Sequence, residues 1–162
     1  MNCLNCGAPL ELSDGRTVLS CRYCQSTRQL QCDSDDGDRI VSLDRPADSN
    51  CPRCHEQLVQ ASLDGRRAEF CTHCHGILLE TAIFADVTSS RRAAFTGSEL
   101  VARPIDPELL MERIECPQCE SLMDVHPNYG PGQAVIDSCS ACNLVWLDHS
   151  ELTSIERTPG RR

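Results

Sequence analysis

Short β-prone runs recur along this chain, and each run ends at a cysteine. The runs are residues 17–21, 67–71 and 135–139. A Gly-containing turn signal precedes each run, at Asp14-Gly15, Asp64-Gly65 and residues 129–132. A leucine also follows the preceding cysteine pair by three or four residues, at Leu10, Leu58 and Leu122. Runs of this kind around a Gly turn are typical of a hairpin. The pattern therefore predicts one hairpin unit that is used three times.

Twelve of the thirteen cysteines form six C-x-x-C pairs, which fall into three sets with 14, 16 and 19 residues between the two pairs. Two such pairs at hairpin distance bring four thiolates to one point, the arrangement of a structural zinc site. The candidate ligands are Cys3, Cys6, Cys21 and Cys24; Cys51, Cys54, Cys71 and Cys74; and Cys116, Cys119, Cys139 and Cys142. We therefore predict three structural zinc ions, one in each set, and leave Cys32 without a metal.

Other uses of these cysteines remain open on sequence alone. Four thiolates also accept iron. Disulfides require an oxidising compartment, and the chain begins Met1-Asn2-Cys3 without a basic and apolar leader, so we expect a cytoplasmic protein with reduced thiols. A thioredoxin-like motif needs a single C-x-x-C beside a βαβ pattern, which is not the spacing here. Zinc is the metal that the spacing favours.

Composition indicates that metal contributes to folding. The chain has 162 residues but only one Trp, two Tyr and three Phe. Units of roughly 25–40 residues rarely fold on apolar burial alone. The predicted fold class is small, metal-stabilised and mostly β: three zinc ribbons, each made of two cysteine knuckles and a hairpin, with short connecting and C-terminal helices. No stretch has the roughly 18 apolar residues of a membrane span.

The predicted organisation places ribbon 1 at residues 1–31, ribbon 2 at 50–88 and ribbon 3 at 115–157 with a terminal helix. Residues 32–49 form an acidic linker with a short edge strand near 39–43, and residues 89–114 form a connecting helical segment. A helix is also expected over 81–87. Within the connecting segment, Asp106 and Pro107 begin a helix whose packing residues are Leu109, Leu110, Met111 and Ile114.

At the third ribbon, Asp148 and Glu151 form a capping box that starts the terminal helix, and Trp146 is expected to be buried. This ribbon resembles the prokaryotic zinc-ribbon family named after transcription factor IIB. The resemblance rests on residues 116–119 and 139–142, which run into Trp146-Leu147-Asp148 and Glu151-Leu152. Ribbon 2 resembles the family in part, with 78–80 in place of the tryptophan signature, and ribbon 1 resembles a generic zinc ribbon.

The resemblance implies zinc binding, and the family name suggests transcription. A zinc ion held by four cysteines has no open position for a substrate, so we expect a non-enzymatic protein. His55, His73 and His75 are expected to be solvated or sulfur-bonded side chains, and His126 and His149 have no evident partner. The expected function is protein–protein interaction, as an adaptor or regulator with a protein partner and no membrane contact.

Two alternatives stay open. The first is a nucleic-acid-binding, transcription-associated factor. The formal net charge of −9 disfavours it, although Arg66-Arg67, Arg91-Arg92 and Arg161-Arg162 offer local positive charge. The second is a thiol-based redox or metal sensor, for which Cys32 is the one specific indication.

Overall fold

The computed structural model describes Cys3 and residues 6–12, 18–25, 27–29, 38–101, 104–128 and 134–159. Within these residues the chain is mostly β, with two α-helices and three groups of four cysteines that could each hold a metal ion. The predicted fold class is therefore confirmed. Two of the three predicted turns, at 14–15 and 129–132, lie outside the described residues.

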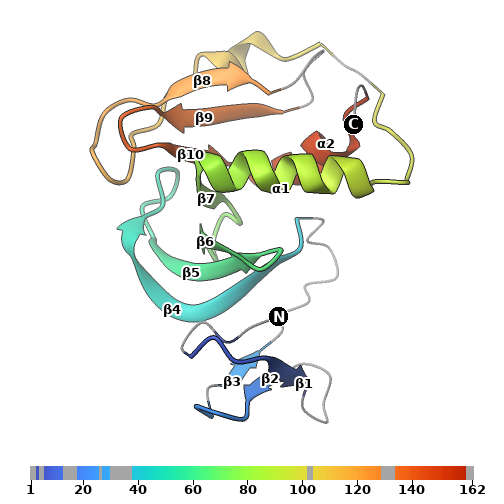
Figure 1. Cartoon of the computed structure of the whole chain (residues 1–162). Helices are drawn as coiled ribbons and strands as arrows, with labels where there is room; N and C mark the ends of the chain where they lie inside the picture. Colours follow the sequence, from blue (N-terminus) through green and yellow to red (C-terminus); the bar gives the residue numbers. More distant parts are fainter. Residues whose placement is uncertain are drawn as a thin grey trace.

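The first ribbon forms a small antiparallel sheet of its own, below the rest of the molecule in Figure 1. Its strands are β1 (Leu10–Leu12), β2 (Val18–Cys21) and β3 (Thr27–Gln29), in the order β1-β2-β3. The predicted run at 17–21 corresponds to β2.

Ribbons 2 and 3 share one seven-stranded antiparallel sheet, in the order β4-β5-β6-β7-β10-β9-β8. Ribbon 2 supplies β4 (Ile40–Asn50), β5 (Gln57–Leu63), β6 (Arg66–Phe70) and β7 (Ile77–Glu80). Ribbon 3 supplies β8 (Asp124–Pro127), β9 (Val135–Cys139) and β10 (Leu144–Leu147). The predicted edge strand near 39–43 is present as the start of β4. Asp64 and Gly65, with φ of 50° and 81°, form the predicted turn between β5 and β6.

The pairing of β7 with β10 relates the two ribbons by a pseudo-twofold axis. Leu78 lies opposite Trp146, and these two residues occupy the same position, four residues after the last cysteine of their own ribbon. The pairs on either side are Ile77 with Leu147 and Leu79 with Val145, which exchange under the same rotation. The sheet order is symmetric about this axis, except that β4 adds a strand to the outer edge of ribbon 2.

Alternate residues of the central strands point to opposite faces of the sheet, as the strand period of two requires. On one face the apolar side chains of the strands pack with Phe84, Val87, Leu152 and Ile155 of the two helices. On the other face Trp146 and Leu78 pack with cysteines of ribbons 2 and 3. Trp146 is fully buried, as predicted, but it packs between the two ribbons rather than within its own.

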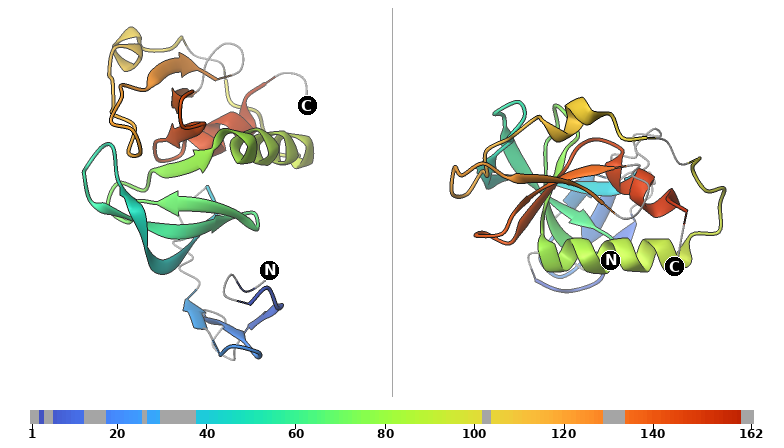
Figure 2. Two further views of the ribbon diagram at one scale, coloured as in Figure 1. Left: turned by 60° about the vertical axis from the view of Figure 1, so that its left-hand side comes forward. Right: turned by 90° about the horizontal axis from the view of Figure 1, so that it is seen from above.

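Helices cover the first of these faces (Figures 1 and 2). α1 (Thr81–Ala94) follows β7, and α2 (Glu151–Arg157) follows β10, so the two helices occupy related positions and pack against each other. The N–H of Thr81 donates to the carbonyl of Asn143 at 2.8 Å, which ties the start of α1 to ribbon 3. The helix expected over 81–87 is present and extends to Ala94.

The acidic stretch before β4 is not only a linker. Asp38 is 1% exposed, and its carboxylate accepts hydrogen bonds from the backbone N–H groups of Ser150 and Thr153, both at 2.8 Å. It also accepts from the Thr153 hydroxyl at 2.7 Å. Asp38 therefore caps the N-terminus of α2 from a distant part of the chain.

One local expectation was wrong in part. Asp106 and Pro107 begin a helical turn as predicted, but it is a single 3-10 turn, η1 (Pro107–Leu110). Ile114 is buried as predicted, whereas Leu109 and Met111 are exposed rather than packed. At the first knuckle of ribbon 3, Met123 is fully buried whereas Leu122 is 64% exposed. Met123 follows its cysteine pair by four residues, as Leu58 does, and a shift of one residue moves a strand side chain to the opposite face.

Candidate metal centres

Each C-x-x-C knuckle turns its chain with one residue of positive φ directly after its second cysteine. These residues are Gly7, Gln25, His55, His75, Glu120 and Asn143, with φ between 55° and 74°. Gly and Asn accept this conformation with the least strain. His55, His75 and Glu120 adopt it as well, so all six knuckles have the same backbone turn.

Backbone hydrogen bonds close the knuckles in the same way. The N–H of Cys51 donates to the Glu56 carbonyl at 2.7 Å, and the N–H of His55 donates back to the Cys51 carbonyl at 2.9 Å. The corresponding bonds at Cys71 and Cys116 are 2.8–2.9 Å long. The N–H groups of Arg53 and Cys54 also point at the Cys51 sulfur, each at 3.4 Å. These N–H groups would stabilise a thiolate in that position.

The structure brings each predicted set of four cysteines together. Within each set, all four Sγ atoms lie within 4.8 Å of one another. The Sγ–Sγ distances are 3.4 Å for Cys3–Cys24 and Cys6–Cys21, 3.4 and 3.5 Å in ribbon 2, and 3.7 Å for Cys119–Cys139. A tetrahedral zinc with Zn–S bonds of about 2.3 Å separates its sulfurs by about 3.8 Å. The three groups therefore have the size of a tetrahedral metal site, and all twelve thiols are free of disulfides.

The protein environment alone does not deprotonate every thiol. Burial raises the pKa of Cys51 to about 11, although the N–H groups of Cys54 and Arg53 act in the opposite direction. The backbone N–H and the hydroxyl of Ser121 lower the pKa of Cys119 to about 6. A bound metal ion would displace the remaining protons, which makes metal affinity dependent on pH.

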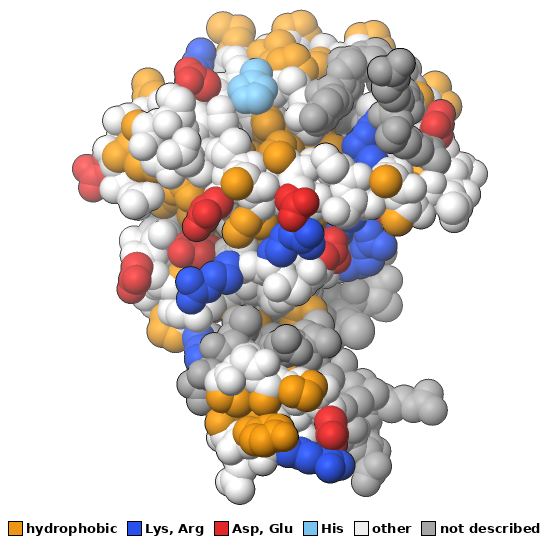
Figure 3. Space-filling view, in the orientation of Figure 1, with side chains coloured by type: hydrophobic (Ala, Val, Ile, Leu, Met, Phe, Trp, Pro, Cys, Tyr) orange, Lys and Arg blue, Asp and Glu red, His pale blue; other side chains and the backbone are white. Residues whose placement is uncertain are grey.

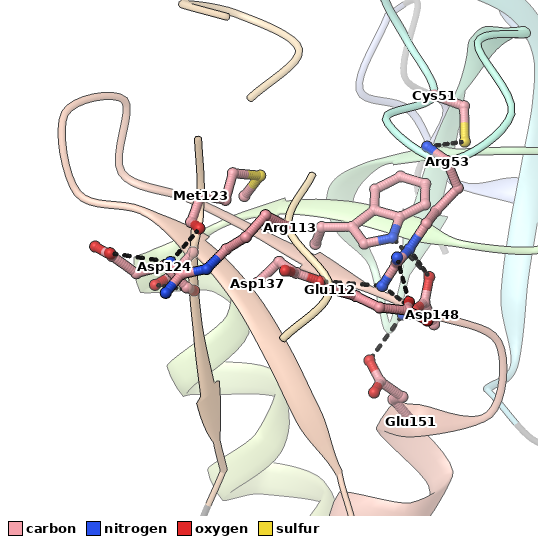
Figure 4. A network of polar contacts seen from close by, with 11 residues as sticks. Cys51, Arg53, Glu112, Arg113, Met123, Asp124, Asp137, Asp148 and Glu151 are labelled. Carbon is pink, nitrogen blue, oxygen red and sulfur yellow. Dashed lines mark hydrogen bonds and ion pairs between the residues drawn. The ribbon is translucent and has the colours of Figure 1, made fainter. Parts of the chain in front are cut away.

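Arg53 connects ribbon 2 to ribbon 3 beside these centres (Figure 4). From the knuckle of Cys51 and Cys54, its guanidinium donates to both carboxylate oxygens of Asp148, at 3.2 and 2.8 Å. It also lies 3.5 Å from Asp137 and 3.0 Å from Glu112. Burial lowers the pKa of Arg53, but the hydrogen bond and charge of Asp148 outweigh this and raise it. The fork geometry of the guanidinium fits such a bidentate contact.

Sequence reasoning did not find this network, although a signal for it was present. Aligning the cysteines of ribbon 2 with those of ribbon 3 places Asp137 and Asp148 at the positions of Glu69 and Glu80. Carboxylates at equivalent positions in both ribbons indicate that each ribbon has a polar site at the same place on the sheet. The Trp146 indole N–H also donates to Asp148, at 2.8 Å, so Asp148 is held from both ribbons.

Only half of the predicted capping box forms. The Glu151 carboxylate accepts from the Asp148 N–H at 2.8 Å, but the Asp148 side chain turns to Arg53 and Trp146 instead of the helix. Burial is the main cause that raises the pKa of Glu151 from 4.5 to about 8, and the nearby charge of Asp148 adds to it. Glu151 is therefore largely protonated in the folded chain at neutral pH.

We expect Glu151→Gln to stabilise the protein at alkaline pH. Between about pH 4.5 and pH 8 the folded chain keeps a proton on Glu151 that the unfolded chain has lost, so stability falls as pH rises through this window. Gln keeps the acceptor for the Asp148 N–H and has no proton to lose. The variant should gain at least about 1.4 kcal/mol at pH 9, the free energy of one pKa unit. Urea unfolding at several pH values above 6.5 measures this gain, with Glu108→Gln as the exposed control. If the free energy of unfolding depends on pH in Glu151→Gln as it does in the unchanged protein, the raised pKa of Glu151 is contradicted.

The five histidines are either exposed or in contact with another side chain. His55 and His73 are exposed, and His75 contacts the rings of Phe70 and His149 with centroid distances of 5.8 and 5.3 Å. His149 thus has a partner, as does His126, whose Nε2 lies 3.1 Å from the Ser138 hydroxyl. Cys32 lies outside the described residues.

Two of the three arginine pairs lie in the described part of the chain. Arg91 and Arg92 are 4% and 8% exposed. Arg91 pairs with Asp64, and Arg92 donates to the carbonyls of Ile155 and Thr158 at 2.7 and 3.0 Å. Arg66 pairs with Asp86 at 2.7 Å. Arg91-Arg92 is therefore a structural pair that packs α1 onto its neighbours, and Arg161-Arg162 lies outside the described residues.

The hairpins, the knuckles and the three four-cysteine groups together define a protein built from zinc ribbons. Residues 50–86 match the family model of the TFIIB zinc ribbon, described as a transcription factor zinc-finger. The match spans ribbon 2, whereas the sequence motifs rank ribbon 3 nearest to this family, and that ranking stays a prediction. Searches of curated proteins and of solved structures gave no match to the chain. In the part of the chain that the structure describes, no helix is long and apolar enough to cross a membrane.

Proposed function

We propose that this protein is a non-enzymatic zinc-binding module with three structural zinc ions, which acts by binding another protein as an adaptor or regulator. The observation that carries the proposal is the composition of the three metal sites. Each site has four cysteine sulfurs within 4.8 Å of one another, which saturate a tetrahedral ion. A saturated ion has no position for a water or a substrate, so its role is to hold the fold.

The surface supports an interaction role. Leu109, Met111 and Leu122 are 49%, 80% and 64% exposed, and all three lie in or next to ribbon 3. Exposed carboxylates surround them in the sequence, at Glu108, Glu112, Glu115 and Glu120. Contiguous apolar patches rimmed by polar residues are a feature of surfaces that bind other proteins, and we propose that these three side chains contribute to one. The four carboxylates outnumber the one exposed arginine among them, Arg113, so a partner with a basic rim would fit this region.

A pull-down from the native cell tests the adaptor function. The tagged protein is compared before and after zinc chelation. A Leu109→Ser/Met111→Ser variant tests whether the exposed apolar side chains bind the partner. We expect a stoichiometric protein partner that is recovered with the zinc form and lost from the other two samples. Recovery of no protein, or of nucleic acid only, would contradict the proposal.

The second candidate is a nucleic-acid-binding factor, which the description of the matched family favours. Charge opposes it. Each zinc ion bound by four thiolates adds −2 to the formal net charge of −9, so the chain with three zinc ions would carry −15. On the face shown in Figure 3, basic side chains lie beside acidic ones and form no continuous basic surface. Phosphate contacts supply most non-specific affinity for nucleic acids, and such a surface provides few.

We therefore expect no sub-micromolar binding to single- or double-stranded DNA or RNA at about 0.15 M salt, a physiological ionic strength. Fluorescence anisotropy with labelled oligonucleotides measures it, and Arg66→Ala/Arg67→Ala is the matched variant. Tight binding that weakens as salt rises and disappears in this variant would replace the adaptor function with the second candidate.

A further inference from the structure

The two halves of the large sheet carry the same polar site, but among the described residues only one of the two sites has a cation that bonds its carboxylates. Matching the cysteines of ribbon 2 with those of ribbon 3 pairs Arg53 with Gln118, Glu69 with Asp137 and Glu80 with Asp148. The pseudo-twofold axis at Leu78 and Trp146 relates the two sites in space. The two sites therefore occupy equivalent positions in ribbons 2 and 3.

In the first site the knuckle residue of ribbon 2 neutralises the carboxylates of ribbon 3. The Arg53 guanidinium donates to both oxygens of Asp148 and lies 3.5 Å from Asp137. Asp137 is only 3% exposed, so without this cation a buried carboxylate would face another carboxylate.

In the second site the equivalent cation is absent. The knuckle of ribbon 3 has the neutral Gln118 where ribbon 2 has Arg53. Ser49 hydrogen-bonds the Glu69 carboxyl, and the Oε2 atom of Glu69 is closed off from solvent without a hydrogen-bond partner, as is Oδ1 of Asp137 in the first site. The two sites therefore differ in the cation that lies between the carboxylates and not in the orphan oxygen. Among the described residues, no basic side chain lies within ion-pair distance of Glu69 or Glu80.

A groove of about 590 Å³ surrounds this second site. Its lining includes Glu69, Glu80, Leu144, Gln118 and Asp48. Arg67 is the one arginine on the lining; it is exposed to solvent and forms no ion pair with these carboxylates within the described part of the chain. The groove thus has three carboxylates against one arginine, a neutral knuckle and room for a long side chain.

We propose that this groove binds an arginine side chain of the partner protein, with its guanidinium placed between Glu69 and Glu80 as Arg53 is placed between Asp137 and Asp148. This inference rests on the proposed adaptor function and names the chemistry of its partner. Arginine fits better than lysine because its planar fork bonds two carboxylates at once, and because the same fold already holds a guanidinium in the equivalent place.

The test is a titration of the ¹⁵N-labelled zinc protein with N-acetyl-arginine amide, with the citrulline analogue as the uncharged control of the same shape. We expect saturable shifts at the backbone amides of Glu69, Glu80, Gln118 and Leu144, and affinity for the citrulline analogue at least tenfold weaker. Equal binding of the two compounds, or shifts spread over other acidic regions, would overturn the proposal.

Three variants make the test specific. Gln118→Arg supplies the missing cation from the chain itself, so it should abolish the shifts while the zinc content stays unchanged. Glu69→Gln should weaken binding at least tenfold, and Glu108→Gln, an exposed carboxylate outside the groove, should leave it unchanged. Arginine binding that survives Gln118→Arg would overturn the assignment. Absence of shifts at these amides would overturn the arginine-binding groove. The adaptor function would then still be tested independently by the pull-down.

Discussion

Replacing Cys139 by Ser is expected to unfold ribbons 2 and 3 together, with loss of both of their zinc ions. Cys139 belongs to the third four-cysteine group and also ends β9, and its neighbour β10 pairs with β7 of ribbon 2. A structural zinc contributes roughly 10–16 kcal/mol to folding. The whole stability of a typical domain is only about 5–15 kcal/mol, so the loss of one ion removes the shared sheet.

Zinc content and amide hydrogen exchange measure this effect. We expect the variant to lose protection in β5 and β6 as well as in β8–β10, whereas ribbon 1, which has its own sheet, keeps its zinc. Cys32→Ser is the matched control and should leave the zinc content unchanged. Protection that persists in β5 and β6 would mean that the two ribbons fold independently.

Trp146→Ala should lower the free energy of unfolding by about 3–5 kcal/mol, the usual cost of truncating a fully buried aromatic side chain. The indole lies opposite Leu78 on the pseudo-twofold axis and packs on Gly76. A Cβ atom added at Gly76 would lie 2.1 Å from the indole ring, so no space separates the two ribbons here. The substitution also removes the N–H that bonds Asp148 at 2.8 Å.

Denaturant unfolding of the zinc-bound protein, followed by circular dichroism, gives the change. Leu144→Ala, on the same strand but partly exposed, is the control and should cost less. Gly76→Ala should reproduce part of the effect, about 1–3 kcal/mol, because it overpacks the same contact. A Trp146→Ala variant as stable as the control would show that the ribbon interface contributes little.

The local structure could be predicted from the sequence because cysteine spacing and turn residues act over short distances. The knuckles, the Asp64-Gly65 turn and the strands that enter the second knuckles all follow from such signals. The burial of Trp146 was predicted correctly as well. For the knuckles, the turn and these strands the physical cause is local in the sequence, whereas the burial of Trp146 also depends on Leu78 and Gly76 of the other ribbon.

The joint sheet could not be predicted in the same way. Pairing of β7 with β10 depends on which strand edges meet after folding, and the residues involved are nearly seventy positions apart. The roles of Arg53 and Asp38 have the same origin, since their partners lie in ribbon 3. Leu122 shows a different limit, because a register difference of one residue decides whether it or Met123 is buried.

Elemental analysis of the purified protein, produced without added metal, tests the central claim most directly. Three four-cysteine groups of tetrahedral size predict three zinc ions per chain, and their removal by a chelator should abolish the circular dichroism of the β-sheets. Iron in place of zinc, fewer than three ions per chain, or a metal-free form with unchanged circular dichroism and exchange protection would contradict it.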